Sequence, residues 1–452
     1  MKSNENRLEN KVYLETFGCQ MNVSDSERVK TNLTAHGYQI VNSEALADVV
    51  LINTCSVREK AEQKLYHRIG RIRHARGADK QPTIGVMGCV AQLEGETLLG
   101  KPQKIDFVIG TKATGRIAEI VSRHALAQKR TVDLGEREAG YDWTVAPTAR
   151  NSPYVAFVPI IEGCNKFCTY CIVPFSRGRE ESRPATEIIN EIHSLHRQGI
   201  REIHLIGQNV NSYRPPSLEG LAEFRGATPF VKLLRAAAAT RIERIKFTTS
   251  FPRDFQADIV AAINEHENLC NWVHLPVQSG SDRVLTRMRR GHPVKAYLKH
   301  IETIKNSRRP ISLTSDIIVG FPGETKADFA ATKLLVEQCQ YDGLYIFKYS
   351  PRPGTPAATL PDDLSEDVKQ ERFLELEQTQ RSVQKMVYER YLNRVLSVLA
   401  EKISPKKDSD LSGHSTCHKV VNFAAQGAQL GNILQVKITE AKLNSFYGTI
   451  IN

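Results

Sequence analysis

The sequence predicts an α/β protein built from an open parallel sheet, a partial barrel of βα units and a small final β-domain. Three observations lead to this prediction. Short apolar runs alternate with amphipathic stretches over residues 10–125, six more strand–helix units follow over residues 150–383, and two strand-like stretches lie within residues 384–452. With 452 residues, 41% of them hydrophobic, the chain is long enough for about three domains with their own cores.

The first domain alternates buried strands with helices. Asp48–Asn53 is almost continuously apolar, which is typical of a strand buried on both faces. Helices are expected over Ser24–His36 and Glu59–His74, and residues from about 120 to 150 have the mixed charge of a connector. The expected strands are Lys11–Phe17, Asp48–Asn53, Pro82–Met87 and Ile105–Ile109.

The second domain repeats the strand–helix pattern. Thr186–Gln198 is a representative helix, with its isoleucines and Leu195 on one face. Six such units in a row favour a parallel sheet curled into a partial (β/α)6 barrel, and a flat doubly wound sheet is the alternative. The expected strands are Tyr154–Ile161, Glu202–Ile206, Arg244–Thr249, Trp272–Val277, Ser312–Val319 and Gly343–Tyr349.

The third domain follows a long charged helix predicted over Glu366–Glu389. Strands are expected over Val395–Ile403 and Asn432–Thr439, with a polar stretch between them that contains Pro405 and Gly413. Residues 391–452 hold seven Lys or Arg and four Asp or Glu, which gives a net charge of +3. Such a small basic β-domain is consistent with nucleic-acid binding.

Charge and composition narrow the class of protein. Lys and Arg outnumber Asp and Glu by 61 to 50, which favours polyanionic partners such as tRNA or rRNA. No apolar run approaches the ~20 residues of a membrane span. Met1–Lys11 lacks the apolar segment of a signal peptide, so a cytoplasmic protein is expected. In that reducing compartment, the clustered members of the nine cysteines are expected to bind metal or take part in catalysis.

Cys164, Cys168 and Cys171 form a C-x3-C-x2-C motif directly after the first strand of the predicted barrel. Three thiolates on a short loop can bind three irons of a 4Fe-4S cubane and leave the fourth iron open to a small molecule. The alternatives are a zinc site or free thiols. Zinc favours two ligand pairs, and no fourth Cys or His lies at finger spacing here.

A second set of cysteines is spread along the first domain. Cys19, Cys55 and Cys89 are 36 and 34 residues apart, yet each comes just past a predicted strand. Carboxyl ends of parallel strands meet at one edge of a sheet, so three adjacent strands would bring the three thiols together. Together with the cysteine motif of the second domain, this favours a second three-cysteine cluster over three separate buried cysteines.

The cysteine motif and several strand-end stretches resemble the radical SAM superfamily. Gly207–Asn211 (GQNVN), Gln278–Gly280 (QSG) and Asp316–Glu324 (DIIVGFPGE) follow the second, fourth and fifth strands. The resemblance implies that Gln208 and Asn209 meet the amino group of S-adenosylmethionine. It further implies that Gln278 contacts the ribose, Arg290 the carboxylate, and Ile318 and Gly320 the adenine.

The chain as a whole resembles the methylthiotransferases, which combine a three-cysteine domain, a radical SAM core and a TRAM domain. Phe17–Asn22 (FGCQMN), Cys168–Pro174 (CTYCIVP), Gly207–Tyr213 (GQNVNSY) and Lys348–Thr355 (KYSPRPGT) carry this resemblance, and Pro405 to Phe423 departs from the usual TRAM pattern. It implies domains over residues 10–125, 150–383 and 384–452. It also implies two 4Fe-4S clusters, one on each cysteine set.

Within that family the likeness is to the branch that modifies isopentenyladenosine at tRNA position 37. The resemblance implies that one S-adenosylmethionine methylates a sulfide and a second generates the radical that activates adenine C2. It implies as partners the tRNA anticodon stem-loop, a flavodoxin or ferredoxin as electron donor and a sulfur donor, with the enzyme a monomer. Basic runs at His67–Arg76, Arg283–Arg290 and Lys305–Arg309 could contact phosphate or be solvated helix faces.

Three alternatives stay open. A methylthiotransferase of ribosomal protein S12 is disfavoured by Gln20-Met21-Asn22 and by the basic final domain. A threonylcarbamoyladenosine enzyme differs only in the modification it accepts. A non-catalytic iron–sulfur RNA-binding sensor needs only one cluster and no set of S-adenosylmethionine contacts.

Overall fold

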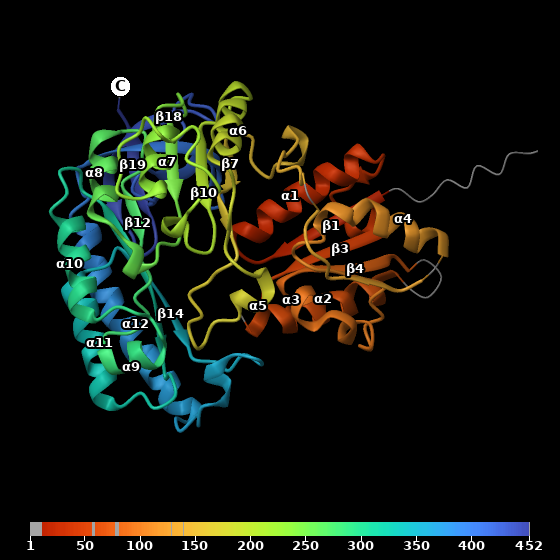
Figure 1. Cartoon of the computed structure of the whole chain (residues 1–452). Helices are drawn as coiled ribbons and strands as arrows, with labels where there is room; N and C mark the ends of the chain where they lie inside the picture. Colours follow the sequence, from red (N-terminus) through yellow and green to blue (C-terminus); the bar gives the residue numbers. More distant parts are fainter. Residues whose placement is uncertain (1–10, 57–58, 77–80, 128, 139, 452) are drawn as a thin grey trace, which may run out of the picture. The chain divides into compact units, whose positions relative to one another are not determined.

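The computed structural model describes residues 11–56, 59–76, 81–127, 129–138 and 140–451 (Figure 1). The first ten residues, on which the signal-peptide expectation rests, lie outside this range. The chain divides into two compact units. The first comprises Met1–Asn151, Glu162–Asn165 and Ile172–Glu180, and the second Ser152–Ile161, Lys166–Cys171 and Glu181–Asn452.

The first unit is an open parallel sheet with the strand order β2-β1-β3-β4-β5-β6. Its strands are β1 (Lys11–Phe17), β2 (Gln39–Ile40), β3 (Val49–Thr54), β4 (Thr83–Gly88), β5 (Phe107–Ile109) and β6 (Thr131–Asp133). Its helices are α1 (Gln20–Ala35), α2 (Glu59–Arg76), α3 (Cys89–Glu94), α4 (Ile117–Ala127) and α5 (Val173–Arg177). The predicted open parallel-sheet domain is confirmed.

Helices cover both faces of this sheet. Every residue of β3 is buried, as its continuous apolar sequence predicts. Val49 and Leu51 pack on one face in a core shared with α1 and α4. Val50 and Ile52 pack on the other face, in a core shared with α2 and α3. Because side chains of a strand alternate between faces, only a strand covered on both sides needs apolar residues at every position.

One stretch of the first unit departs from the sequence prediction. Residues from about 120 to 150 were expected to form a connector, but this stretch contains the end of α4 and the strand β6. β6 pairs in parallel with β5, from Phe107 opposite Thr131 to Ile109 opposite Asp133. Its three residues are only half-buried, so they carry little of the hydrophobic signal that marks a central strand.

The second unit begins with the six predicted βα strands, arranged as two parallel sheets with the orders β11-β10-β7 and β12-β13-β14. Two isolated parallel β-bridges lie outside these strand pairings: one pairs Leu269 with Ile245, and the other pairs Gln278 with Ile317. This is the predicted partial barrel, rather than one flat doubly wound sheet. The strands are β7 (Val155–Pro159), β10 (Glu202–Ile206), β11 (Arg244–Phe247), β12 (Trp272–His274), β13 (Ser312–Val319) and β14 (Gly343–Lys348).

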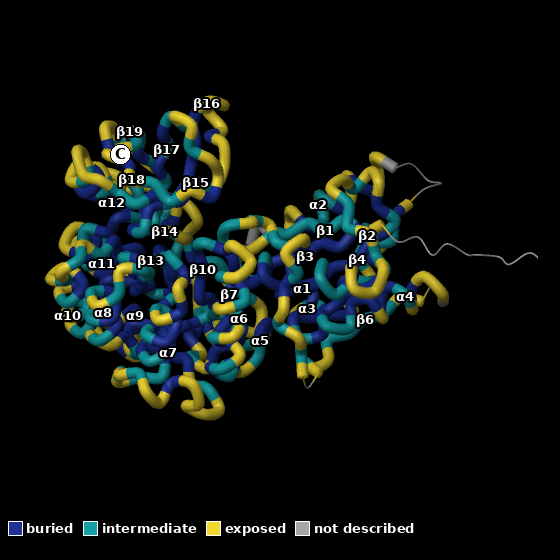
Figure 2. The backbone as a smooth tube through the Cα atoms, turned by 90° about the horizontal axis from the view of Figure 1, so that it is seen from above, coloured by how far each residue is buried: buried dark blue, intermediate teal, exposed yellow. Residues whose placement is uncertain are grey.

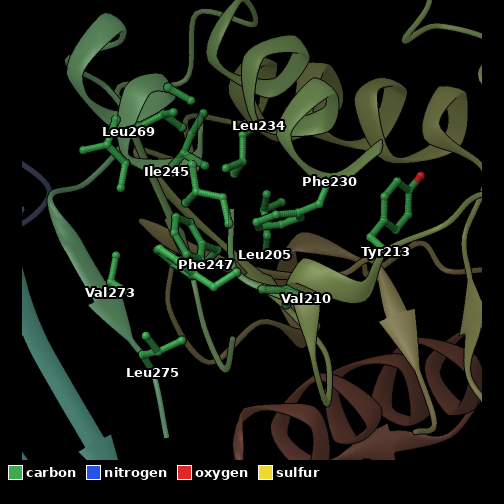
Figure 3. Close-up of a cluster of buried hydrophobic side chains, with 14 of the residues drawn as sticks. Leu205, Val210, Tyr213, Phe230, Leu234, Ile245, Phe247, Leu269, Val273 and Leu275 are labelled. Carbon is green, nitrogen blue, oxygen red and sulfur yellow. The ribbon is translucent and has the colours of Figure 1, made fainter. Parts of the chain in front are cut away.

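The barrel core lies between these strands and the helices that follow them (Figure 3). Leu205, Ile245, Phe247 and Val273 pack with Phe230 of α7 in this core. Figure 2 shows that buried positions follow the strands. The helices are α6 (Ala185–Arg197), α7 (Pro229–Ala238), α8 (Ala257–Glu265), α9 (Asp282–Arg287), α10 (Val294–Lys305), α11 (Lys326–Cys339) and α12 (Glu366–Glu389), and two short strands, β8 (Ile161–Glu162) and β9 (Glu181–Ser182), flank the cysteine loop.

The final segment is a closed barrel with the order β15-β16-β17-β19-β18. Its strands are β15 (Val395–Ser404), β16 (Lys407–Ser415), β17 (Val420–Ala424), β18 (Ile433–Ala441) and β19 (Phe446–Ile450). The stretch after Pro405 that the sequence marks only as polar therefore contains two strands. Three polar side chains of β16 are buried inside the barrel segment: Asp410, Ser412 and Ser415. Asp410 accepts a hydrogen bond from Tyr447 at 3.0 Å.

Among the described residues, no helix is both long enough and apolar enough to cross a membrane. The isolated cysteines are core residues: Cys270, Cys339 and Cys417 are each buried. His204 is also packed rather than open, because its Nε2 lies 2.6 Å from Glu202 Oε1 inside the barrel.

Candidate functional site

The three scattered cysteines follow three neighbouring strands of the first unit. Cys19 is the N-cap residue of α1 after β1, Cys55 comes directly after β3, and Cys89 opens α3 after β4. β1, β3 and β4 are adjacent in the sheet and parallel. The fold therefore puts the three thiols at one carboxyl edge, as the sequence predicts.

A direct contact links two of these cysteines. A hydrogen bond with Cys55 lowers the pKa of Cys19 to about 6. The Cys19 thiol also donates to Asn22 Oδ1 at 3.2 Å. Burial raises the pKa of Cys89, against the effect of the neighbouring Arg177. The chemical surroundings thus favour a thiolate at Cys19, and a thiolate is the form that binds metal.

A pair of amides supports the edge beneath the cysteines. Asn22 Nδ2 donates to Asn53 Oδ1 at 2.8 Å, and Asn53 Nδ2 donates to the Asn22 carbonyl at 2.8 Å. Gly88 has a φ of +92°, and a Cβ there would lie 2.2 Å from Asn53 Oδ1. Gly88 thus leaves room for the Asn53 amide, which ties β3 to α1.

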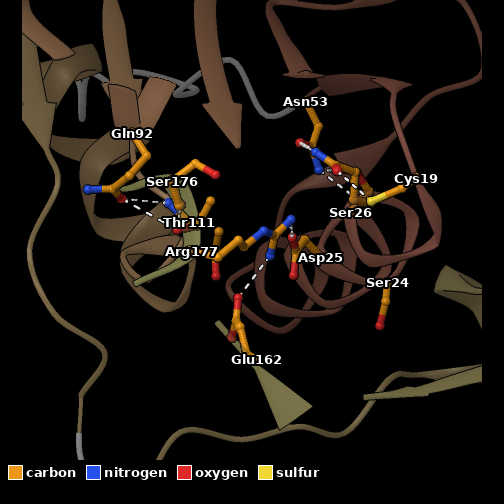
Figure 4. A network of polar contacts seen from close by, with 12 residues as sticks. Cys19, Ser24, Asp25, Ser26, Asn53, Gln92, Thr111, Glu162, Ser176 and Arg177 are labelled. Carbon is orange, nitrogen blue, oxygen red and sulfur yellow. Dashed lines mark hydrogen bonds and ion pairs between the residues drawn. The ribbon is translucent and has the colours of Figure 1, made fainter. Parts of the chain in front are cut away.

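A buried network of charges lies beside Cys19 and Cys89. Figure 4 shows Arg177 of this network with Asp25 and Glu162. Arg177 of α5 forms ion pairs with Asp25 of α1 at 2.7 Å and with Glu162 at 2.8 Å. Arg28 also pairs with Asp25, and Arg137 with Glu162. Within the described residues this network has three cations and two anions, with every side chain at most 11% exposed. Its surplus positive charge is therefore held out of water beside the thiols.

The residues present fit an iron–sulfur cluster better than a single ion. In the described part of the chain, no three His, Cys, Asp or Glu side chains come together closely enough to hold one metal ion. A cubane cluster takes one thiolate on each of three irons, so its ligands need not converge on one point. Three thiols at one sheet edge, with a guanidinium beside them, suit an anionic cluster of this kind.

The second cysteine set lies on the loop between β8 and α5. The Cys164 amide donates to the Gly178 carbonyl at 3.2 Å, within the first unit. In the second unit, Arg290 Nη1 lies 3.5 Å from Cys168 Sγ, and Arg290 Nη2 donates to the Pro276 carbonyl at 2.6 Å. The Arg290 guanidinium also lies 4.4 Å from the centre of the Phe251 ring. Arg290 is thus fixed against a cysteine of the motif.

The predicted cofactor contacts gather at the carboxyl ends of barrel strands. Gln208 and Asn209 follow β10, and Gln208 Oε1 is buried without a hydrogen-bond partner among the described residues. Gln278 has a φ of +78°, a left-handed conformation that residues with a side chain adopt uncommonly. Ile318 is near the end of β13 and Gly320 follows it. An orphaned acceptor and a strained backbone at strand ends fit a polar ligand such as S-adenosylmethionine.

Comparison with known proteins identifies the family. The model of the uncharacterized protein family UPF0004 matches residues 11–110, and that of the radical SAM superfamily matches residues 158–336. Curated proteins named tRNA-2-methylthio-N(6)-dimethylallyladenosine synthase match nearly end to end. The one from Photorhabdus laumondii is 41% identical over 445 residues, 98% of this chain and 92% of that protein. The one from Koribacter versatilis is 40% identical over 444 residues, with 97% and 98% covered.

The chain belongs to this synthase family. It is a radical SAM enzyme of the methylthiotransferase type, which uses S-adenosylmethionine and a 4Fe-4S cluster. Solved structures agree on the fold. TsrM, a radical S-adenosylmethionine methyltransferase from Kitasatospora setae, gives a TM-score of 0.56 at 13% identity, covering 77% of this chain and 75% of that chain. OxsB, a cobalamin-dependent radical enzyme, gives 0.51 at 12% identity, covering 83% and 56%.

Sequence reasoning missed the charged network of this synthase-family chain. Arg177, Asp25 and Glu162 carry no motif of their own. Charged residues are usually exposed, so nothing in the sequence marks these three as buried partners.

In two of the three basic stretches of this family member, individual arginines make contacts within the fold. Arg283 pairs with Asp328, and Arg290 is buried against Cys168. Arg309 donates to main-chain carbonyls at the end of α8, including those of Ile263 and His266. The third stretch is different, because α2 leaves a stripe exposed at helical spacing: Lys64, His67, Arg71 and His74.

Proposed function

We propose that this chain converts N6-isopentenyladenosine at tRNA position 37 to its 2-methylthio derivative, replacing the C2–H bond by C2–S–CH3. The observation that carries the proposal is end-to-end similarity, at about 40% identity, to curated proteins named for this reaction. The two cysteine sets at strand ends give that similarity a chemical basis. Adenine C2 is neither acidic nor strongly electrophilic, so a radical route suits the reaction.

Each cysteine set would hold one 4Fe-4S cluster. Cys19, Cys55 and Cys89 would bind the first, and the motif Cys164, Cys168 and Cys171 would bind the second. When bound, the clusters supply the electron that cleaves S-adenosylmethionine and the sulfur that enters the product. Three protein ligands leave one iron of each cluster open, which both tasks need.

The protein side chains would bind and orient S-adenosylmethionine. Gln208 Oε1 is a free acceptor suited to the amino group, and Asn209 beside it is buried. Arg290, held by Pro276 and Phe251, is suited to the carboxylate. Gln278 is assigned to the ribose, and Ile318 with Gly320 to the adenine. Burial of these groups limits the access of water to a reactive radical.

Transfer RNA is the expected partner. The exposed basic stripe on α2 and the final barrel are candidate contacts for its phosphates. We place the domains at residues 10–125, 150–383 and 384–452, and the enzyme in the cytoplasm, where its RNA substrate is modified. Flavodoxin or ferredoxin is the expected electron donor, and a sulfur donor would restore the sulfur consumed.

Nucleoside mass spectrometry tests the function directly. The protein would be reconstituted anaerobically with iron and sulfide and given S-adenosylmethionine, reductant and tRNA carrying isopentenyladenosine. A methylthio mass gain is expected in the parent enzyme, lost in Cys19→Ala and Cys164→Ala and retained in Cys339→Ala, which changes only a core cysteine.

Parallel reactions separate the alternatives. A gain on threonylcarbamoyladenosine tRNA or on ribosomal protein S12, in place of isopentenyladenosine, would keep the chemistry and replace the substrate. No gain on any substrate, together with iron for a single cluster and no release of deoxyadenosine, would replace the enzyme by an iron–sulfur sensor.

A further inference from the structure

Arg177 is brought to the scattered cysteines by a helix that belongs to the other cysteine motif. It ends α5, which begins two residues after Cys171. The helix end is anchored in the first unit, where Thr111 Oγ1 donates to the Ser176 carbonyl at 2.8 Å. The Thr111 amide donates in turn to Gln92 of α3 at 3.0 Å. Figure 4 shows Gln92, Thr111, Ser176 and Arg177. Because α3 opens with Cys89, these contacts help to fix Arg177 beside that cysteine.

The guanidinium of Arg177 is held on two sides by carboxylates. Nη2 lies 2.7 Å from Asp25 Oδ2 and Nη1 lies 2.8 Å from Glu162 Oε1, and the side chain is 2% exposed. It also donates to the Cys89 thiol and acts electrostatically on Cys19. A guanidinium is rigid and planar, so two carboxylates that fix its fork also fix the direction of its remaining N–H groups.

The charge of the surroundings points to an anionic occupant. The carboxylates of Asp25 and Glu162 face the guanidinium groups of Arg28, Arg137 and Arg177, which leaves one positive charge in excess among these described side chains. A buried charge without a counter-charge is strongly unfavourable. The Cys89 thiol, which Arg177 contacts, and the nearby Cys19 thiol would supply negative charge as thiolates.

We infer that Arg177 is the positioning residue that raises the reduction potential of the cluster on Cys19, Cys55 and Cys89. The inference rests on the proposed assignment of those cysteines as cluster ligands. A fixed positive charge and an N–H donor beside ligand sulfur stabilise the reduced, more negative state of a cluster. Loss of Arg177 should therefore make the potential more negative, and loss of an opposing carboxylate should make it more positive.

The experiment isolates one cluster. The triple variant Cys164→Ala/Cys168→Ala/Cys171→Ala serves as the parent, so that only the cluster on Cys19, Cys55 and Cys89 remains. Arg177→Gln, Glu162→Gln and Arg137→Gln are each added to it. Iron and sulfide are quantified after anaerobic reconstitution. Each potential is then measured by redox titration followed by electron paramagnetic resonance.

The expected shifts have opposite signs. Arg177→Gln should disfavour reduction at least tenfold, which is about 59 mV to the negative for one electron. Glu162→Gln should shift the potential to the positive. Arg137→Gln removes the same charge from the network without touching a cysteine, so its shift should be smaller than that of Arg177→Gln. A purely structural role would lower iron content without producing opposite shifts.

Three results would overturn the inference. The first is an unchanged potential in Arg177→Gln, and the second is an equal shift in Arg137→Gln. The third is a shift of Glu162→Gln that is absent or negative, which decides the matter even if Arg177→Gln fails to fold. A parent without iron is a different failure, because it would remove the ligand assignment of the proposed function and the inference with it.

Discussion

The buried ion pair between Lys419 and Asp342 should hold the final barrel against the radical SAM core. Lys419 directly precedes β17 of the barrel, and its Nζ is 2.8 Å from Asp342 Oδ1 and 2.7 Å from Ser312 Oγ. Both side chains of the pair are at most 8% exposed. Tyr391 donates to Asp342 at 3.0 Å, and its ring also lies beside the lysine.

Lys419→Met should destabilise this contact by about 3–5 kcal/mol, because it leaves a carboxylate buried without its cation. Asp342→Asn should cost a similar amount, since it strands the ammonium. The double variant removes both charges and should cost much less than the sum of the single variants. The resulting interaction energy should reach about 1.5–3 kcal/mol.

The destabilisation caused by Lys419→Met should not change between pH 6 and 9. Burial alone would lower the pKa of Lys419, but Asp342 and Tyr388 hold it above its usual value. A raised pKa gives stability that is complete below the unfolded value of about 10.4 and is lost only as pH rises through the folded value. The range from pH 6 to 9 lies below both the unfolded and the folded pKa of Lys419.

Tryptophan fluorescence can follow this contact selectively. Trp272 of β12 stacks on His418, one residue before Lys419, with ring centres 4.0 Å apart. The only other tryptophan is Trp143, so urea unfolding in a Trp143→Phe background reports on the Trp272 environment. Additive single-variant costs within about 0.5 kcal/mol, or a cost of Lys419→Met below about 1 kcal/mol, would refute the reasoning.

Three further predictions concern other parts of the molecule. Asp328→Asn should cost about 1.5–3 kcal/mol at pH 7, because Arg283 helps to hold the pKa of Asp328 below its usual range despite burial. The difference in thermal midpoint from the parent should begin to shrink as pH falls below about 4, the unfolded value, and should be lost only as pH falls through the lower folded pKa. Gly163→Ala should reduce the iron bound beside it, measured by iron analysis, because a Cβ there would lie 1.9 Å from a main-chain oxygen at a φ of +77°. Lys64→Gln/Arg71→Gln should weaken tRNA binding and lower the slope of log affinity against log salt by about 0.9 for each phosphate that is no longer neutralised, measured by filter binding.

Each of these has a matched control. Glu302→Gln changes an exposed carboxylate and should leave the pH dependence of the thermal midpoint unaltered. Gly199→Ala has a similar φ of +83° with nothing within 4 Å of the added Cβ, so iron binding should survive. Lys333→Gln changes a lysine that pairs with Glu375 and should leave the salt slope unchanged. A control that behaves like its test variant would contradict the corresponding explanation.

Much of the fold follows from local sequence pattern. Glu202–Ile206, Ser312–Val319 and the helix Glu366–Glu389 have the bounds that the sequence predicts. These elements are long or fully buried, so their apolar periodicity is strong. β6 and β16 were missed for the opposite reason: one is short and half-buried, and the other buries polar side chains that only closure of the barrel can satisfy.

The sequence by itself determined that Cys19, Cys55 and Cys89 each follow a strand, because buried strands are encoded in local hydrophobic pattern, and it gave the ends of these three strands to within one residue. Only the tertiary structure decided that β1, β3 and β4 are neighbours and that Arg177 lies between Asp25 and Glu162 beside those cysteines. The partners in that network are up to 152 residues apart in the chain. Packing alone brings them together, and only burial makes their charges act strongly on one another.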